Sequence, residues 1–147
     1  MITLKKKFED LDSFVINKKV ILRVDLNLPS FEGDIVDFTR LEKISPTIKY
    51  LLKRKAKIIL ISHMGRPNQE NKESLSLKLL SSKISAYINS ELVFLEDNIV
   101  NIKKDKIEKA FGNCNVILLE NLRFFKEEES NDDSFSKKII LFCRYLC

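Results

Sequence analysis

Short apolar runs alternate along the chain with longer segments in which apolar residues recur at helical spacing. The short runs are β-branched or leucine-rich and too short for helices, so they predict buried strands that begin at residue 20 and span 57–61, 92–95 and 115–119. The periodic segments predict helices over 39–54 and 75–89, a shorter helix near 104–111, and a last helix capped by polar residues 131–133. Pro46 lies inside the first helical pattern and predicts either a kink there or a helix that begins at that residue.

Strands that alternate with helices in this way are typical of a parallel sheet wrapped by helices. We therefore expect an α/β fold with a doubly wound, Rossmann-like parallel sheet. Right-handed connections would bring the carboxyl ends of all strands to one edge of that sheet. Ligands of open parallel sheets bind beyond that edge.

The first predicted strand runs directly into polar residues. Arg23, Asp25 and Asn27 occupy alternating positions, so they share one side of an extended backbone. A buried charge needs an ionic partner or a cleft in which a ligand meets it. One alternative is that Arg23 and Asp25 form a structural ion pair with each other.

Other strands end in similar chemistry. His63 and Arg66 follow the second strand, Arg123 follows the fourth, and Arg40 opens the first long helix. Each alone could be an ordinary surface residue, but their convergence on one edge favours a binding site. Because guanidinium groups match carboxylate and phosphate oxygens, we expect a small ligand that carries several negative charges.

Composition narrows the function classes. The chain of 147 residues suits one domain or part of a larger protein, and 44% hydrophobic residues argue against disorder. Residues 1–7 do not form a secretory signal and no apolar run could cross a bilayer, so we expect a cytoplasmic protein without a membrane partner. One histidine and three unpaired cysteines make a structural metal site improbable, and we expect reduced thiols and no metal.

The net charge of +5 is compatible with an anionic partner but does not indicate its chemical class. The lysine clusters lack the interleaved aromatic residues of a stacking platform, which disfavours a nucleic-acid partner. The chain has only three glycines and no glycine-rich phosphate loop, so a self-contained nucleotide site is not expected.

Four motifs together carry a family resemblance. Residues 23–29 (RVDLNLP), 37–40 (DFTR) followed by 46–48, 62–67 (SHMGRP) and 118–124 (LLENLRF) resemble the N-terminal domain of phosphoglycerate kinase, in the same order and spacing. The resemblance runs from about residue 4 to residue 138.

The resemblance implies a two-domain kinase, monomeric, whose N-terminal domain holds 3-phosphoglycerate and whose C-terminal domain holds Mg-ATP. It implies glycolytic phosphoryl transfer between ATP and the substrate carboxylate. Asp25 and Asn27 would bind the glycerate end of the substrate. His63, Arg66 and Arg123 would bind its phosphate, and Arg40, as the catalytic residue, would bridge toward the transferring phosphoryl group. The full expected set of substrate-binding residues is Asp25, Leu26, Asn27, Arg40, His63, Met64, Gly65, Arg66 and Arg123.

The C-terminal residues depart from the family pattern. We expect residues 1–140 to form an incomplete substrate-binding domain and residues 141–147 an aberrant tail, which a frameshift would explain. The nucleotide-binding domain is expected to be absent, which would leave the chain inactive alone and without a bound cofactor. We also expect the strands that would complete the sheet to be missing, which would leave one sheet edge unpaired and make the chain marginally stable and prone to aggregate. The alternative interpretations are a non-catalytic anion-binding fragment of a decaying or split gene and, less favoured, a basic nucleic-acid binder.

Overall fold

In the part of the chain that the structure describes, the main sheet has five parallel strands. The computed structural model describes residues 12–28, 30–31, 34–35, 37–142 and 145–146. The strands lie in the order β5-β6-β4-β1-β7 and all neighbouring pairs are parallel. They are β1 (Lys19–Arg23), β4 (Lys57–Ile61), β5 (Leu92–Leu95), β6 (Val116–Leu119) and β7 (Tyr145–Leu146). The predicted α/β class and the parallel sheet are confirmed.

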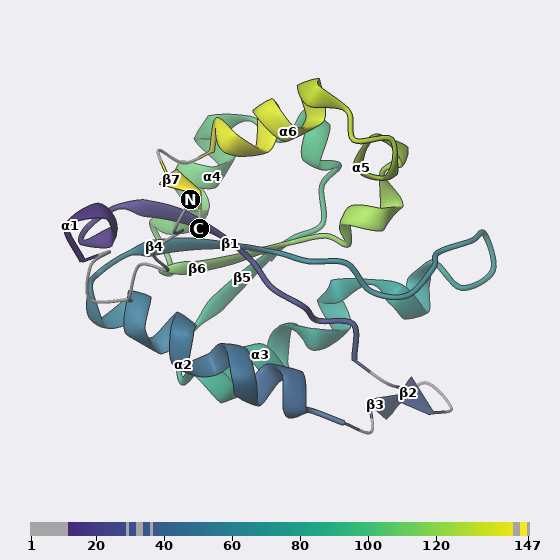
Figure 1. Cartoon of the computed structure of the whole chain (residues 1–147), viewed down its shortest axis with the longest axis horizontal. Coiled ribbons are helices and arrows are strands. Elements are labelled where there is room, and N and C mark those ends of the chain that lie inside the picture. The colour runs from purple at the N-terminus through teal and green to yellow at the C-terminus, as the bar shows by residue number, and fades with distance from the viewer. Residues whose placement is uncertain (1–11, 29, 32–33, 36, 143–144, 147) are drawn as a thin grey trace, which may run out of the picture.

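Helices cover both faces of the sheet (Figure 1). On one face lie α2 (Thr39–Lys53) and α3 (Ser81–Ile88), and on the other lie α4 (Lys104–Phe111) and α6 (Asp133–Ile140). The remaining elements are α1 (Asp12–Val15), α5 (Lys126–Glu129), the two-stranded hairpin β2 (Ser30–Phe31) and β3 (Asp34–Ile35), and the 3₁₀ turns η2 (Glu73–Leu75), η3 (Leu77–Leu80), η4 (Ile99–Asn101) and η5 (Leu122–Phe124).

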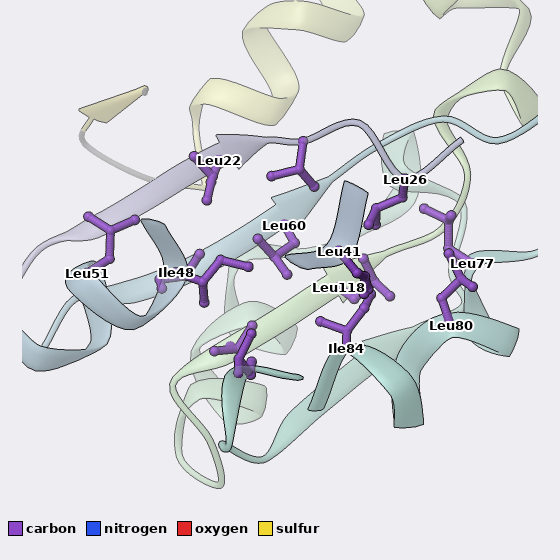
Figure 2. Packing of buried hydrophobic residues seen from close by; sticks show 14 of the residues in the cluster. Leu22, Leu26, Leu41, Ile48, Leu51, Leu60, Leu77, Leu80, Ile84 and Leu118 are labelled. Atoms are coloured by element: carbon purple, nitrogen blue, oxygen red, sulfur yellow. The ribbon is translucent and has the colours of Figure 1, made fainter. Parts of the chain in front are cut away.

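Alternating strand residues fill two separate apolar layers. Ile58 and Leu60 of β4 pack with α2 and α3, as the cluster in Figure 2 shows for Leu60. Ile59 and Ile61 point the other way and pack with α4 and α6. Each fully buried side chain of this size stabilises the fold by about 1.5–3 kcal/mol. The central strands are therefore continuous apolar runs because both of their faces are covered.

Two helix predictions need correction. The expected helix over 75–89 is instead two 3₁₀ turns followed by α3, because Ser76 adopts an extended conformation (φ −69°, ψ 133°) and interrupts the helical hydrogen bonds. The helix that contains Pro46 begins at Thr39, so the interpretation that it begins at Pro46 is wrong. Asp37 stabilises that start by accepting hydrogen bonds from the backbone N–H and the hydroxyl of Thr39 (2.8 and 2.6 Å).

The edge of β1 is also better covered than the sequence indicates. Tyr145 and Leu146 form β7 and pair with Val20 and Ile21, so β1 is not an outer strand at these positions. The outer strands of the described sheet are β5 and β7. Other residues of the expected tail, 143, 144 and 147, lie outside the described part. Leu141 at the end of α6 is 70% exposed. Among the described residues, no helix has both the length and the apolar character needed to cross a membrane.

Candidate functional site

The connections that follow β4 and β6 leave the sheet in opposite directions. After β4 the chain passes to α3 on one face, whereas after β6 it passes to α6 on the other face. These strands are neighbours, so their diverging exits create the crevice in which doubly wound sheets bind ligands. The polar residues predicted from the sequence lie at this crevice and at the adjoining exit of β1.

A buried serine fixes these three exits relative to one another. The hydroxyl of Ser62, just after β4, donates to the carbonyl of Val24 (2.7 Å) and accepts from the N–H of Leu26 (3.0 Å). The carbonyl of Ser62 accepts a hydrogen bond from the N–H of Leu122 after β6 (3.0 Å). Hydrogen bonds between segments far apart in the sequence thus fix the relative positions of the backbones that carry the candidate residues.

The exit of β1 presents its polar residues on one side, as predicted. Arg23, Asp25 and Asn27 are exposed and alternate with buried apolar residues. Arg23 pairs with Glu128 of α5 (Nη2 to Oε1, 2.9 Å), so the interpretation of an Arg23–Asp25 ion pair is wrong. Asp25 Oδ1 instead accepts from the N–H of Asn27 (3.0 Å), which closes a tight turn at the strand end.

Arg40 also pairs with Asp25. Its Nη1 lies 2.6 Å from Oδ1 and 2.7 Å from Oδ2 of the carboxylate. Burial raises the pKa of Asp25, but the hydrogen bond from Asn27 and the Arg40 guanidinium outweigh it and leave that pKa below its ordinary value. Asp25 is accordingly an anion, and Arg40 is held beside it at the entrance to the crevice.

A glycine connects the exit of β1 with the exit of β6. The N–H of Gly65 donates to Asn27 Oδ1 (2.9 Å), and its carbonyl accepts from Arg123 Nη1 (2.7 Å). Gly65 has a φ of +59°, and a Cβ added there would lie 2.6 Å from Leu75 Cδ2. The backbone conformation therefore favours glycine at this position, and a larger residue would also have to displace the end of the Leu75 side chain.

His63 lies among charged groups of this site. Its partial burial, followed by the positive charges of Arg123 and Arg23, lowers the pKa of the imidazole below its ordinary value of 6.5. The carboxylates of Glu128 and Asp25 act in the opposite direction but are outweighed. The imidazole is thus neutral near pH 7, and an arriving anion would favour its protonation.

Arg66 and Arg123 line one open cleft of about 700 Å³. Lys72 and Lys126, two lysines that the sequence did not point to, line the same cleft, and Glu129 is the one acidic residue among the described residues that line it. Four cations against one carboxylate favour a ligand with several negative charges. Lys72 lies in a polar insertion and Lys126 precedes an acidic run. Neither position has a sequence pattern that would have identified the lysine as a binding residue.

Leu26 and Met64 are placed differently from the other predicted site residues. Their side chains belong to the apolar layer beneath α2 and α3 and are 0% and 6% exposed. Their N–H groups are already bonded, that of Leu26 to Ser62 Oγ and that of Met64 to Asn121 Oδ1 (3.2 Å). These two residues therefore lie in the core. The other predicted residues, apart from His63 and Arg66, are linked by the hydrogen bonds described above. His63 lies close to Arg123 and Asp25, and the cleft itself is lined by Arg66 and Arg123.

The buried polar residues that organise the site are Ser62, Glu120 and Asn121. Glu120 and Asn121 directly follow β6 and belong to the same motif as Arg123. Their place in that motif is the only feature of the sequence that points to a role at the site. Among the described residues, no group of three or more histidines, cysteines or carboxylates could hold a metal ion.

Comparisons with known proteins agree with one another. A family model described as "Phosphoglycerate kinase" matches residues 9–146. A phosphoglycerate kinase from Clostridium botulinum (strain Hall) is 44% identical over 136 residues, which are 92% of this chain and 34% of that protein. One from Clostridioides difficile (strain 630) is 43% identical with the same coverage.

Two solved structures share the fold. Phosphoglycerate kinase from Pyrococcus horikoshii OT3 superposes with a TM-score of 0.79 at 30% identity, covering 95% of this chain and 35% of that one. The enzyme from Coxiella burnetii gives a TM-score of 0.77 at 27% identity, covering 95% and 33%. The chain therefore spans about a third of the length of the relatives it matches.

Proposed function

Because the chain belongs to the phosphoglycerate kinase family, we propose that its crevice binds 3-phosphoglycerate for reversible phosphoryl transfer between ATP and the substrate carboxylate. The observation that carries this proposal is the placement of Arg66 and Arg123 on one cleft, at the exits of the two strands that flank the crevice. Family membership supports a place in glycolysis and in the cytoplasm.

The two ends of the substrate would meet different groups. Arg66 and Arg123 would hold the phosphate, because guanidinium groups match its oxygens in charge and geometry. His63, which lies close to Arg123, would assist them. Asp25 and Asn27, at the other side of Gly65, would hold the glycerate end. The Asp25 carboxylate would accept a hydrogen bond from the glycerate hydroxyl, and the side-chain N–H groups of Asn27 would donate to the substrate carboxylate. The hydrogen bonds from Gly65 to Asn27 and from Arg123 to Gly65 support this division, since they join the two subsites through one residue.

Arg40 would act on the reacting end. Its pairing with Asp25 keeps its charge close to where the substrate carboxylate would lie. Charge that meets the transferring phosphoryl group in the transition state lowers the barrier without strengthening substrate binding. We therefore assign Arg40 to turnover and the phosphate-side cations to binding.

We propose that the described part of the chain holds no site for Mg-ATP. The sequence has three glycines and no phosphate-cradling loop, and the described residues offer no group of metal ligands. We derive no step through the nucleotide, and we propose that this chain alone binds substrate without turning it over. As an isolated chain it would then act as an anion-binding module, which is the second function that these observations favour.

Isothermal titration calorimetry of the chain with 3-phosphoglycerate tests the proposal. Saturable one-site binding is expected, and Arg66→Ala should weaken it at least tenfold. Lys109→Ala removes one exposed positive charge from α4 and serves as the control, with an affinity unchanged within twofold. Absence of saturable binding by folded protein, or equal losses in both variants, would overturn the proposal.

A further inference from the structure

We propose that Asn121 is a positioning residue that holds the cation-bearing loop of residues 65–74 against the exit of β6. This inference rests on the proposed function of the cleft. Asn121 is 0% exposed, so it cannot touch a ligand and must act through its neighbours. The loop carries Arg66 and Lys72, two of the four cations that line the cleft.

The side-chain amide of Asn121 joins both ends of this loop. Its Nδ2 donates to the carbonyl of Met64 (2.8 Å), where the loop begins, and to that of Leu75 (2.9 Å), where it ends. Its Oδ1 accepts from the N–H of Met64 (3.2 Å) and from that of Arg123 (3.1 Å). The two bonds with Met64 reproduce the pairing that a backbone amide makes in a sheet. Both donor hydrogens and both acceptor positions of the amide are therefore used.

Glu120 anchors the chain just after the loop. Its Oε1 accepts from the N–H of Leu77 (3.0 Å) and of Asn121 (2.7 Å), and its Oε2 accepts from the hydroxyl of Ser76 (2.8 Å). This carboxylate is 6% exposed and forms no ion pair within the described part of the chain. Two donors from the residues just after the loop and one from Asn121, the next residue in the chain after Glu120, satisfy it instead. Glu120 and Asn121 thus act as one clamp.

The clamp fixes Arg66 relative to Arg123. The N–H of Arg123 is bonded to Asn121, and its guanidinium is bonded to the carbonyl of Gly65 inside the clamped loop. A loop of ten residues that was joined only by its covalent ends would sample many positions and lose entropy on binding. Held by Asn121, the loop keeps its cations facing the cleft before a ligand arrives, which raises affinity through preorganisation.

Asn121→Ala removes all four hydrogen bonds and should disorder the loop while α2, α3, α4 and the sheet remain folded. The matched control is Ser45→Ala. Ser45 is also buried (5% exposed), and its hydroxyl donates to the carbonyl of Tyr87 (2.9 Å), between α2 and α3 and outside the cleft. Both variants lose buried hydrogen bonds, but only Asn121→Ala loses the bonds to Met64 and Leu75, the two residues that flank the loop.

Two readouts separate positioning from general destabilisation. The ¹⁵N heteronuclear NOE of amides in 65–74 reports loop order without any ligand, and calorimetry with 3-phosphoglycerate and with inorganic phosphate reports affinity. Both are measured at a temperature where each variant is fully folded. For Asn121→Ala we expect reduced NOE values confined to the loop and affinity at least tenfold weaker, whereas Ser45→Ala should match the wild type within twofold.

The inference is overturned if folded Asn121→Ala keeps an ordered loop and wild-type affinity, or if Ser45→Ala produces the same losses. If Asn121→Ala does not unfold cooperatively at low temperature, Ser76→Ala replaces it as the test variant, because Ser76 is half-buried and bonds to Glu120. Smaller decreases in the loop NOE values and in affinity are then expected. Unchanged NOE values and affinity would count against the clamp. If wild-type chain binds neither anion but Asn121→Ala still disorders the loop, the proposed function fails and the clamp stands.

Discussion

The Nη1 atom of Arg40 lies 2.6 and 2.7 Å from the two carboxylate oxygens of Asp25. The side chains are 43% and 57% exposed. An ion pair that is this open to solvent stabilises a fold by less than about 1 kcal/mol, so a ligand anion can replace Asp25 as the partner of Arg40 at small cost. The pair therefore holds Arg40 close to the crevice, and its guanidinium can still exchange Asp25 for a ligand anion.

Arg40→Ala should barely change substrate affinity. The phosphate-side cations remain, and the charge of Arg40 is already neutralised by Asp25 in the free chain. We expect the Kd for 3-phosphoglycerate to stay within about threefold of the wild-type value by calorimetry, compared with at least a tenfold loss for Arg66→Ala. Equal losses in the two variants would contradict the assignment of Arg40 to turnover.

His63 gives a second prediction, because it is the only histidine in the chain. Burial and the charges of Arg123 and Arg23 lower its pKa, so the C2 proton resonance should titrate below pH 6.5. Inorganic phosphate should move the midpoint upward, since a bound anion stabilises the imidazolium. A midpoint at or above 6.5 in the free chain would contradict the described surroundings of His63.

The same depressed pKa predicts the sign of a stability change. Above pH 6.5 the imidazole is neutral in both the folded and the unfolded chain. As the pH falls from 6.5 through the lower folded pKa, the unfolded chain binds the proton more tightly and the free energy of unfolding decreases. Urea titrations across this range should show that decrease, and His63→Gln should reduce it. An unchanged pH dependence in the variant would exclude His63 as its source.

Ser62→Ala should destabilise the whole domain. Its hydroxyl is fully buried and is bonded to both Val24 and Leu26, so the variant leaves a buried N–H and carbonyl without that partner. The free energy of unfolding in urea should fall by about 1–3 kcal/mol. Ser82→Ala, at an exposed position of α3, is the control and should change it by less than about 0.5 kcal/mol. Equal stability of Ser62→Ala and the wild type would refute the registering role of Ser62.

Lys72 and Lys126 should contribute mainly through long-range electrostatics. They line the cleft, but their charges are exposed and are screened by salt. The double variant Lys72→Ala/Lys126→Ala is expected to bind 3-phosphoglycerate several-fold more weakly at low ionic strength, with the difference shrinking in about 1 M salt, where the screening length is about 3 Å. A difference that persists in high salt would indicate direct contacts instead.

The strands could be predicted closely because their apolar runs need no long-range information. The expected bounds of β4 and β5 match the structure, and those of β6 differ by one residue. The helix over 75–89 could not be predicted, because its first part is held by Glu120 and Asn121. These side chains take the carbonyl of Leu75 and the N–H of Leu77 and so replace helical hydrogen bonds.

The sequence also predicted that the polar residues that follow the strands lie close together, because the carboxyl ends of parallel strands lie at one edge of a sheet. What the sequence could not show is which groups pair there. Arg23 bonds to Glu128 and Asp25 to Arg40, and these partners are 105 and 15 positions away in the sequence. The clamp of Asn121 was missed for the same reason, since its bonds to Met64 bridge 57 positions and depend on the finished sheet.

The most direct test of the central claim is to follow the backbone amides of the ¹⁵N-labelled chain by NMR while 3-phosphoglycerate is added. If the crevice binds this substrate, saturable shift changes should concentrate at residues 25–27, 63–66 and 121–124, and Arg123→Ala should weaken them. Shift changes centred elsewhere, for example on the outer surface of α2, or no saturable change in folded protein, would contradict the claim.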